Sequence, residues 1–289
     1  ENGRRGAVLS ASPGSRLPAR DSRRARPAVS SGPMPDERPR PARWLRSEPL
    51  WLGLYLAVLL AWLLDPAHPR VAGLFHDDGV YFSLGRSLVD RGVYRDPHTP
   101  DPIQIAKYPP GEPLLAALCL LLAPEPEEAL GLLRAVHALF LAGALAAFRS
   151  LLHREGGAAA RCAPLLLLAA ALSPPLLDYL RLPMSEIPYL ALSLGTLALL
   201  AKVAQAPERP WRHALPLAAL CFAAFAFRTV GATLTAAGVV SLLLARRPAT
   251  AFRLLLLAGP ALGLLQAYLS AQARPAPCCQ DITVYGPAD

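Results

Sequence analysis

Charged residues are scarce in this chain. Only 17% of its 289 residues are Asp, Glu, Lys or Arg, against about 25% in ordinary soluble domains. Hydrophobic residues make up 53%. They occur in blocks of about 15–23 residues, which are long enough to cross the ~30 Å hydrocarbon layer of a bilayer. The distribution predicts a polytopic membrane protein and argues against a cytosolic enzyme, a collagen or a disulfide-rich secreted domain.

The few cysteines do not form a framework. The chain has five, and none has the spacing of metal ligands. Cys119, Cys162 and Cys221 lie in or beside apolar blocks, where a cysteine usually acts as a small hydrophobic residue. Cys278 and Cys279 are adjacent, and a disulfide between neighbours is strained. The sequence therefore predicts neither a disulfide framework nor a zinc site.

The net charge of +8 does not indicate nucleic acid, because of where the charge lies. Eleven of the 29 basic residues fall in residues 1–48, and most others lie in short loops between apolar blocks. This is the positive-inside pattern of membrane proteins. Residues 1–48 are rich in Pro and Arg and bury too little to fold. We expect a disordered cytoplasmic tail, with contact to anionic lipid as the alternative.

Seven apolar segments are predicted to span the membrane. Two internal breaks divide the pattern: Pro174–Pro175 should bend or end the third span, and Arg228 separates the fifth from the sixth. The predicted fold class is therefore all-α, a polytopic helical bundle over residues 49–272 with an outer-side tail at 273–289. The spans are about 49–64, 129–149, 162–179, 185–203, 213–227, 229–245 and 252–270.

The loop charges predict the orientation. With the N-terminus inside, the cytoplasmic segments hold 11, 3, 3 and 3 Lys and Arg residues, 20 in total, against 8 outside. Such an excess of basic residues marks the cytoplasmic side. Acidic residues are distributed differently, since 10 of the 21 lie in residues 65–128. We therefore expect the chemistry in this first outer loop.

The first outer loop has helical periodicity. Val80, Leu84 and Leu88 recur on one face after the pair Asp77–Asp78, and Gly92 is a plausible stop. A second helix is predicted over about 112–123. We expect both to be amphipathic helices that lie on the outer membrane surface.

Three charged side chains of this loop are candidates for chemistry. Asp77 and Asp78 suit a general base, or a base with a metal ligand, although Asp is also a common helix N-cap. Lys107 is the only lysine of the loop and precedes the stiff turn Tyr108–Gly111. A lysine suits phosphate as a compact charge, although it can also extend towards lipid headgroups.

The combination and order of these motifs resemble the GT-C membrane glycosyltransferases. The closest group is family 39-like, the bacterial relatives of protein O-mannosyltransferase and of the lipid A aminoarabinose transferase. The resemblance covers about residues 49–270 and rests on a first span followed by four motifs. These motifs are Asp77–Tyr81, Lys107–Gly111, Met184–Pro188 and Phe227–Thr229.

The resemblance implies transfer of a sugar from a polyprenyl-phosphate carrier to an acceptor on the outer face of the membrane. It implies that Asp77 is the catalytic base and that Asp78 is a supporting carboxylate or metal neighbour. Lys107 matches the lysine that contacts the carrier phosphate, and Arg228 and Arg181 are looser phosphate-binding candidates. A carboxylate can take the proton of the acceptor hydroxyl, and the departing phosphate needs cations rather than an acid.

Three further residues, Tyr81, Tyr108 and Glu186, are site candidates without an assigned role. A divalent metal at Asp77 and Asp78 is left open, because metal dependence differs within the superfamily. The expected partners are the polyprenyl-phosphate sugar donor, the lipid bilayer and an acceptor protein, lipid or glycan, with no nucleic acid. The expected location is the bacterial inner membrane. Family members have more spans and often a soluble outer domain, so we expect this chain to be an N-terminal part.

Two other classes of function compete with a transferase. A non-catalytic or degenerate membrane subunit would fit the short length. A transporter would need polar residues near the bilayer midplane and often shows internal repeats. Charges in the middle of the predicted spans are nearly absent, which favours the transferase.

Overall fold

The computed structural model describes residues 53, 72, 76–95, 108–207 and 209–272. All of them lie in the unit Ala42–Asp289 that the chain's contacts define. Four predictions fall outside the described residues: the tail at 1–48, the span at 49–64 apart from Gly53, Lys107, and the tail at 273–289.

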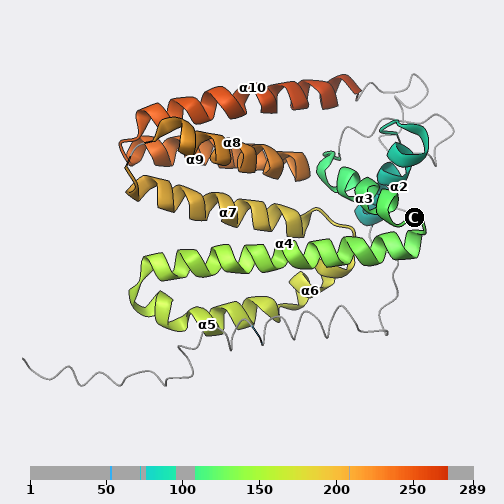
Figure 1. Ribbon diagram of the computed structural model, residues 1–289, viewed down its shortest axis with the longest axis horizontal. Helices are drawn as coiled ribbons and strands as arrows, with labels where there is room; N and C mark the ends of the chain where they lie inside the picture. Colours follow the sequence, from blue (N-terminus) through green and yellow to red (C-terminus); the bar gives the residue numbers. More distant parts are fainter. Residues whose placement is uncertain (1–52, 54–71, 73–75, 96–107, 208, 273–289) are drawn as a thin grey trace, which may run out of the picture. The chain divides into compact units, whose positions relative to one another are not determined.

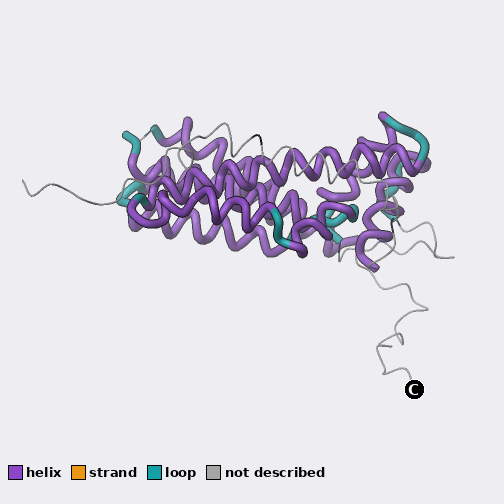
Figure 2. The backbone as a smooth tube through the Cα atoms, turned by 90° about the horizontal axis from the view of Figure 1, so that it is seen from below, coloured by secondary structure: helices purple, strands orange, loops and turns teal. Residues whose placement is uncertain are grey.

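The described residues form helices and contain no strand (Figures 1 and 2), which confirms the predicted all-α class. In chain order the elements are α2 His76–Arg91, α3 Gly111–Leu122, α4 Pro126–Glu155, α5 Gly157–Ala171, α6 Pro174–Arg181, α7 Glu186–Gln205, α8 Pro210–Phe227, the 3-10 turn η2 Thr229–Gly231, α9 Ala232–Leu244 and α10 Pro248–Gln272.

Prolines and glycines mark where many of these helices begin and end. Helices α4, α6, α8 and α10 each begin with a proline, the residue whose missing N–H costs nothing at the first helical position. Gly92 follows α2 with φ +67°, and Gly156 and Gly157 connect α4 to α5 with φ +68° and +53°. Only glycine adopts this left-handed region at little cost.

Three of the helices are long and apolar enough to cross a membrane: α4, α7 and Pro248–Ser270 of α10. The pair α5 and α6 makes a fourth if it is taken as one span, bent by 49° at the break before Pro174, as the sequence predicts. The segment Thr229–Leu244 is apolar but shorter, and α8 carries Arg212 and His213 near its start. The apolar helices therefore indicate an integral membrane protein with three or four candidate spans among the described residues.

The apolar helices pack side by side into a bundle. Helix α4 packs on α7, α7 packs on α8, and α8 and α9 pack on α10. One apolar core lies where α7 to α10 meet and includes Leu200, Leu217 and Leu254. Arg228 interrupts the bundle between α8 and η2, where its backbone is extended at φ −148° and ψ 129°. This break is the one that the sequence predicts.

Helix α4 extends past its neighbour α7 at one end. At about 1.5 Å per residue, the 30 residues of α4 measure about 45 Å and the 20 residues of α7 about 30 Å. Ile187, at the start of α7, packs with Ala138 and Leu141 of α4, so about three turns of α4 lie beyond it. There Leu133 packs against Leu120 of α3. Helices α2 and α3 thus occupy the region beyond the end of α7.

Candidate active site

Asp77 is held by a hydrogen bond from the turn before α3. The Tyr108 hydroxyl donates to Asp77 Oδ1 over 2.7 Å, the usual length of an O–H···O hydrogen bond. Asp77 lies in the first turn of α2, where the helix dipole favours a negative charge. Tyr108 is only 4% exposed, whereas Asp77 is half-buried. A carboxylate with one fixed donor and partial access to solvent can accept a proton, which a general base has to do.

Asp78 has a different environment from its neighbour. It is fully buried, and its Oδ1 accepts the N–H of Gly79 over 2.8 Å. Among the described residues no group of three or more His, Cys, Asp and Glu side chains could hold a metal ion. The structure therefore separates the two predicted carboxylates into one half-buried and one buried group, and a metal at this pair stays a prediction.

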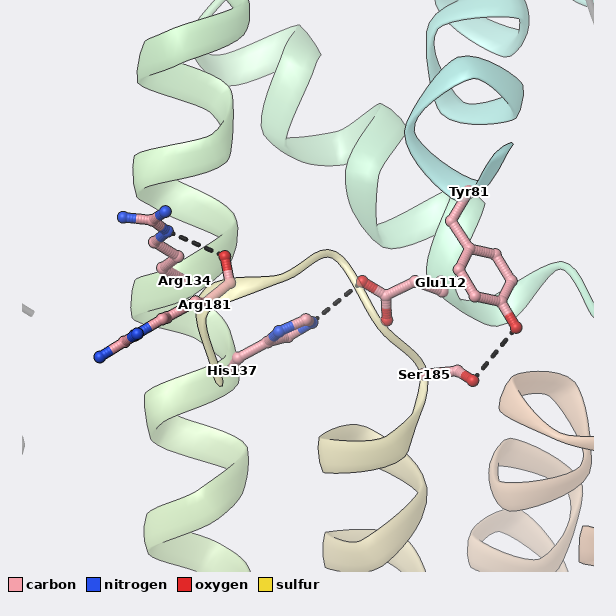
Figure 3. A network of polar contacts seen from close by, with 6 residues as sticks. All are labelled: Tyr81, Glu112, Arg134, His137, Arg181 and Ser185. Carbon is pink, nitrogen blue, oxygen red and sulfur yellow. Dashed lines mark hydrogen bonds and ion pairs between the residues drawn. The ribbon is translucent and has the colours of Figure 1, made fainter. Parts of the chain in front are cut away.

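Tyr108, the hydrogen-bond partner of Asp77, contacts two further tyrosines. The rings of Tyr81 and Tyr108 meet edge to face, with centroids 5.3 Å apart and planes at 83°. The Tyr81 hydroxyl shares a hydrogen bond with Ser185 Oγ over 3.2 Å (Figure 3), and the Tyr94 hydroxyl donates to the Tyr108 carbonyl over 2.9 Å. These contacts fix the turn before α3 against α2.

Burial keeps two of these phenols protonated. It raises the pKa of Tyr81, although the hydrogen bond from Ser185 works in the opposite direction. Burial also raises the pKa of Tyr94 above its ordinary value. A buried phenol resists ionisation because the charged form loses its hydration. Both groups therefore keep their protons to a higher pH than an exposed tyrosine does.

Glu186 and Arg228 form an ion pair between the start of α7 and the break after α8. Arg228 Nη1 donates to Glu186 Oε1. The pair directly follows Ser185, so it lies beside the contact between Ser185 and Tyr81. The Arg228 side chain is 40% exposed, and this bond uses one of its five N–H groups. A phosphate bound at Arg228 would share the guanidinium with Glu186.

Arg181 lies at the end of α6, and its guanidinium is not directed at the tyrosines. Its carbonyl accepts Arg134 Nε over 3.0 Å, and its Nη1 lies 3.6 Å from Asp178 Oδ1. Figure 3 shows the guanidinium pointing away from Tyr81 and Ser185. The structure thus groups Tyr81, Tyr108 and Asp77, adds Glu186 and Arg228 beside them, and leaves Arg181 apart. Its role as a phosphate ligand stays a prediction.

One buried pair is not predicted from the sequence. Glu112, in the first turn of α3, lies 2.9 Å from His137 of α4, measured from Oε1 to Nε2 (Figure 3). Both side chains are 0% exposed. The available signal was an ionisable residue at the start of one apolar run, Glu112, and another inside a predicted span, His137, because such residues are costly in a membrane and usually have a partner.

Comparison with protein-family models, with curated proteins and with solved structures finds no match for this chain. The fold and the apolar helices define its class, an all-helical protein of the membrane-spanning type.

Proposed function

We propose that this chain is a glycosyltransferase that moves a sugar from a polyprenyl-phosphate donor to an acceptor hydroxyl, with Asp77 as the general base. The observation that carries the proposal is the hydrogen bond between Tyr108 and Asp77. It joins two motifs that the sequence separates by 31 residues, Asp77–Tyr81 and Lys107–Gly111. Both motifs belong to the resemblance to the GT-C enzymes.

The proposed chemistry needs one base and nearby cations. The acceptor hydroxyl gives its proton to Asp77 as its oxygen attacks the anomeric carbon. The bond from that carbon to the carrier phosphate breaks, and the phosphate leaves with the electron pair. Its developing charge is stabilised by cations, for which Lys107 and Arg228 are the candidates. A single displacement of this kind inverts the anomeric carbon.

The charges of the bundle support an orientation with the site outside. The turns at the end of the bundle away from α2 and α3 are rich in basic residues, as expected of a cytoplasmic side. We propose that the N-terminus is cytoplasmic, that α8 and η2–α9 also span, and that the membrane is a bacterial inner membrane. The basic residues of that end are Arg149, Arg154, Arg161, Lys202, Arg209, Arg212, Arg246, Arg247 and Arg253.

The proposal is tested by sugar transfer in membrane vesicles supplied with a panel of labelled polyprenyl-phosphate sugars. Asp77→Asn removes the base and should lower the transfer rate by about 100-fold or more. Asp90→Asn is the matched control. Asp90 lies on the same helix in an exposed ion pair with Arg86, and such pairs contribute little.

Full activity in Asp77→Asn would remove Asp77 as the base. Absence of transfer by the wild-type chain with every donor would contradict the proposed function itself. Membrane levels of each variant, measured by immunoblot, separate a lost base from lost protein.

A further inference from the structure

The buried pair of Glu112 and His137 has no part in the transfer chemistry proposed above. Each side chain is 0% exposed, and one hydrogen bond of 2.9 Å joins Glu112 Oε1 to His137 Nε2. The other polar atom of each group, Glu112 Oε2 and His137 Nδ1, has no hydrogen-bond partner among the described residues. The pair thus links α3 to α4 through a single directional contact.

Burying such a pair between two helices costs free energy that an apolar contact would not. Buried polar atoms are normally hydrogen-bonded, and replacing a buried charged pair with apolar residues often leaves a protein as stable or makes it more stable. Apolar side chains already pack α3 on α4, among them Leu120 and Leu133. What the pair adds to that packing is a fixed position for the first turn of α3.

That first turn is closely confined on its other side as well. A Cβ on Gly111 would lie 2.7 Å from the carbonyl oxygen of Ala226 and 2.8 Å from Cγ of Phe227. Gly111 therefore lies directly against the end of α8. With Glu112 bonded to His137, the start of α3 is held between α8 and α4.

The turn before α3 transmits this position to Tyr108. Only Pro109 and Pro110 separate Tyr108 from Gly111. Proline fixes its own φ and restricts the residue before it, so the connection is stiff. Pro110 accepts the N–H of Leu114 over 2.9 Å, which joins the turn to the helix. A shift of the first turn of α3 would therefore displace the Tyr108 hydroxyl.

We infer that Glu112 and His137 are positioning residues: their bond holds the first turn of α3 and thereby places the Tyr108 hydroxyl on Asp77. The consequence for catalysis rests on the proposed function. The placement of Tyr108 does not, because it is a property of the folded chain that can be measured without any substrate.

The placement is tested by ¹⁹F NMR of the detergent-purified full chain with 3-fluorotyrosine at position 108. Asp77→Asn gives the reference change in chemical shift for an altered contact. Glu112→Leu should also move the signal. Thr196→Val is the matched control, because Thr196 is equally buried but its hydroxyl donates to Leu192 O within α7, over 2.7 Å. It should leave the signal unchanged.

A double variant separates positioning from simple stability. Glu112→Leu and His137→Leu each leave one buried polar group unpaired, so each should unfold at a lower temperature, and the double variant should regain stability. We expect the double variant to keep the displaced ¹⁹F signal and to transfer sugar at least about tenfold more slowly, with the donor KM within about twofold. Glu112→Gln keeps an acceptor for His137 and should stay within about threefold of wild type.

Two outcomes would overturn the inference. One is an unchanged Tyr108 signal in both Glu112→Leu and the double variant. The other is a double variant that regains stability together with full transfer and the native signal. If the wild-type chain transfers no sugar, the proposed function fails, but the ¹⁹F signal still decides whether the pair positions Tyr108.

Discussion

Tyr108 uses each of its parts in a different contact. Its hydroxyl donates to Asp77, its ring packs edge to face with Tyr81, and its carbonyl accepts the hydroxyl of Tyr94. The residue thus joins the start of α2 and the segment that follows α2 to the turn before α3. Substitutions that remove one contact and keep the others can show what each contributes.

Tyr108→Phe removes the hydroxyl and keeps the ring against Tyr81. Under the proposed function the transfer rate should fall by about tenfold, which corresponds to ~1.4 kcal/mol. A hydrogen bond to a charged group contributes about 1.5–3 kcal/mol, and the half-exposure of Asp77 favours the lower end. The measurement is kcat in vesicles. Tyr94→Phe, which removes only the bond to the Tyr108 carbonyl, should have a smaller effect, and an equal effect of the two would contradict this role of the hydroxyl.

The buried phenols should be visible in an alkaline titration. Burial raises the pKa of both Tyr81 and Tyr94, whereas an ordinary tyrosine ionises near pH 10. In the folded chain, Tyr81→Phe or Tyr94→Phe should leave the tyrosinate absorbance at about pH 10 unchanged. In the unfolded chain, each should remove the signal of one of the eight tyrosines. Loss of signal in the folded chain would show that the phenol is not protected.

The raised pKa of these phenols also makes the free energy of unfolding depend on pH. The folded state holds these protons more tightly than the unfolded state does. Their contribution to the free energy of unfolding is therefore complete below about pH 10 and is lost as the pH rises through the folded pKa. The unfolding temperature should therefore fall less steeply with rising alkaline pH in Tyr81→Phe than in the wild-type chain.

At the scale of the helices, the sequence predicts positions along the chain well. The predicted loop helices, one after the pair Asp77–Asp78 and stopped by Gly92 and the other at about 112–123, correspond to α2 at His76–Arg91 and α3 at Gly111–Leu122. The breaks at Pro174–Pro175 and at Arg228 are also present. These features could be predicted because proline, glycine and apolar periodicity act on the local backbone.

Partners across the fold could not be predicted in the same way. The contacts of Glu112 with His137, of Tyr108 with Asp77 and of Arg228 with Glu186 join residues 25, 31 and 42 positions apart. Periodicity shows which face of a helix is buried but not which side chain it meets. The candidate spans among the described residues do not include α8 or the segment Thr229–Leu244, and that segment is shorter than the ~20 residues that a span needs.

The start of α3 gives a prediction about close packing. Gly111→Ala places a Cβ against Ala226 and Phe227, and overpacking of this kind costs about 1–3 kcal/mol. The variant should unfold at a lower temperature in detergent and, under the proposed function, transfer sugar more slowly. Gly143→Ala is the control, because nothing lies within 4 Å of its added Cβ. Alanine should stabilise that turn of α4 by up to about 1 kcal/mol.

The two glycine variants together exclude a general effect of added methyl groups. Equal unfolding temperatures for Gly111→Ala and Gly143→Ala would contradict the close approach of α3 to α8.

At the scale of the whole molecule, the asymmetry of charge predicts the orientation in the membrane. Reporters fused after Gly156, Pro207 or Arg247 should report the cytoplasm, because these turns carry the basic residues. Reporters after Pro124, Pro183 or Val230 should report the opposite side. Alkaline phosphatase and green fluorescent protein fusions measure the two sides independently. A reversed pattern would place Asp77 in the cytoplasm and contradict transfer on the outer face.

The unequal lengths of α4 and α7 have a consequence for the lipid in which the protein works. Helix α7 matches a hydrocarbon layer of about 30 Å, whereas α4 exceeds it by about 15 Å. A bilayer a few ångströms thicker would therefore submerge Ser185 and Glu186, and with them the ion pair to Arg228, in acyl chains. Hydrophobic mismatch of this kind costs fractions of a kcal/mol per Å and sorts proteins among membranes. Under the proposed orientation we therefore expect a preferred bilayer thickness, set by α7, above which the polar end of the bundle is desolvated.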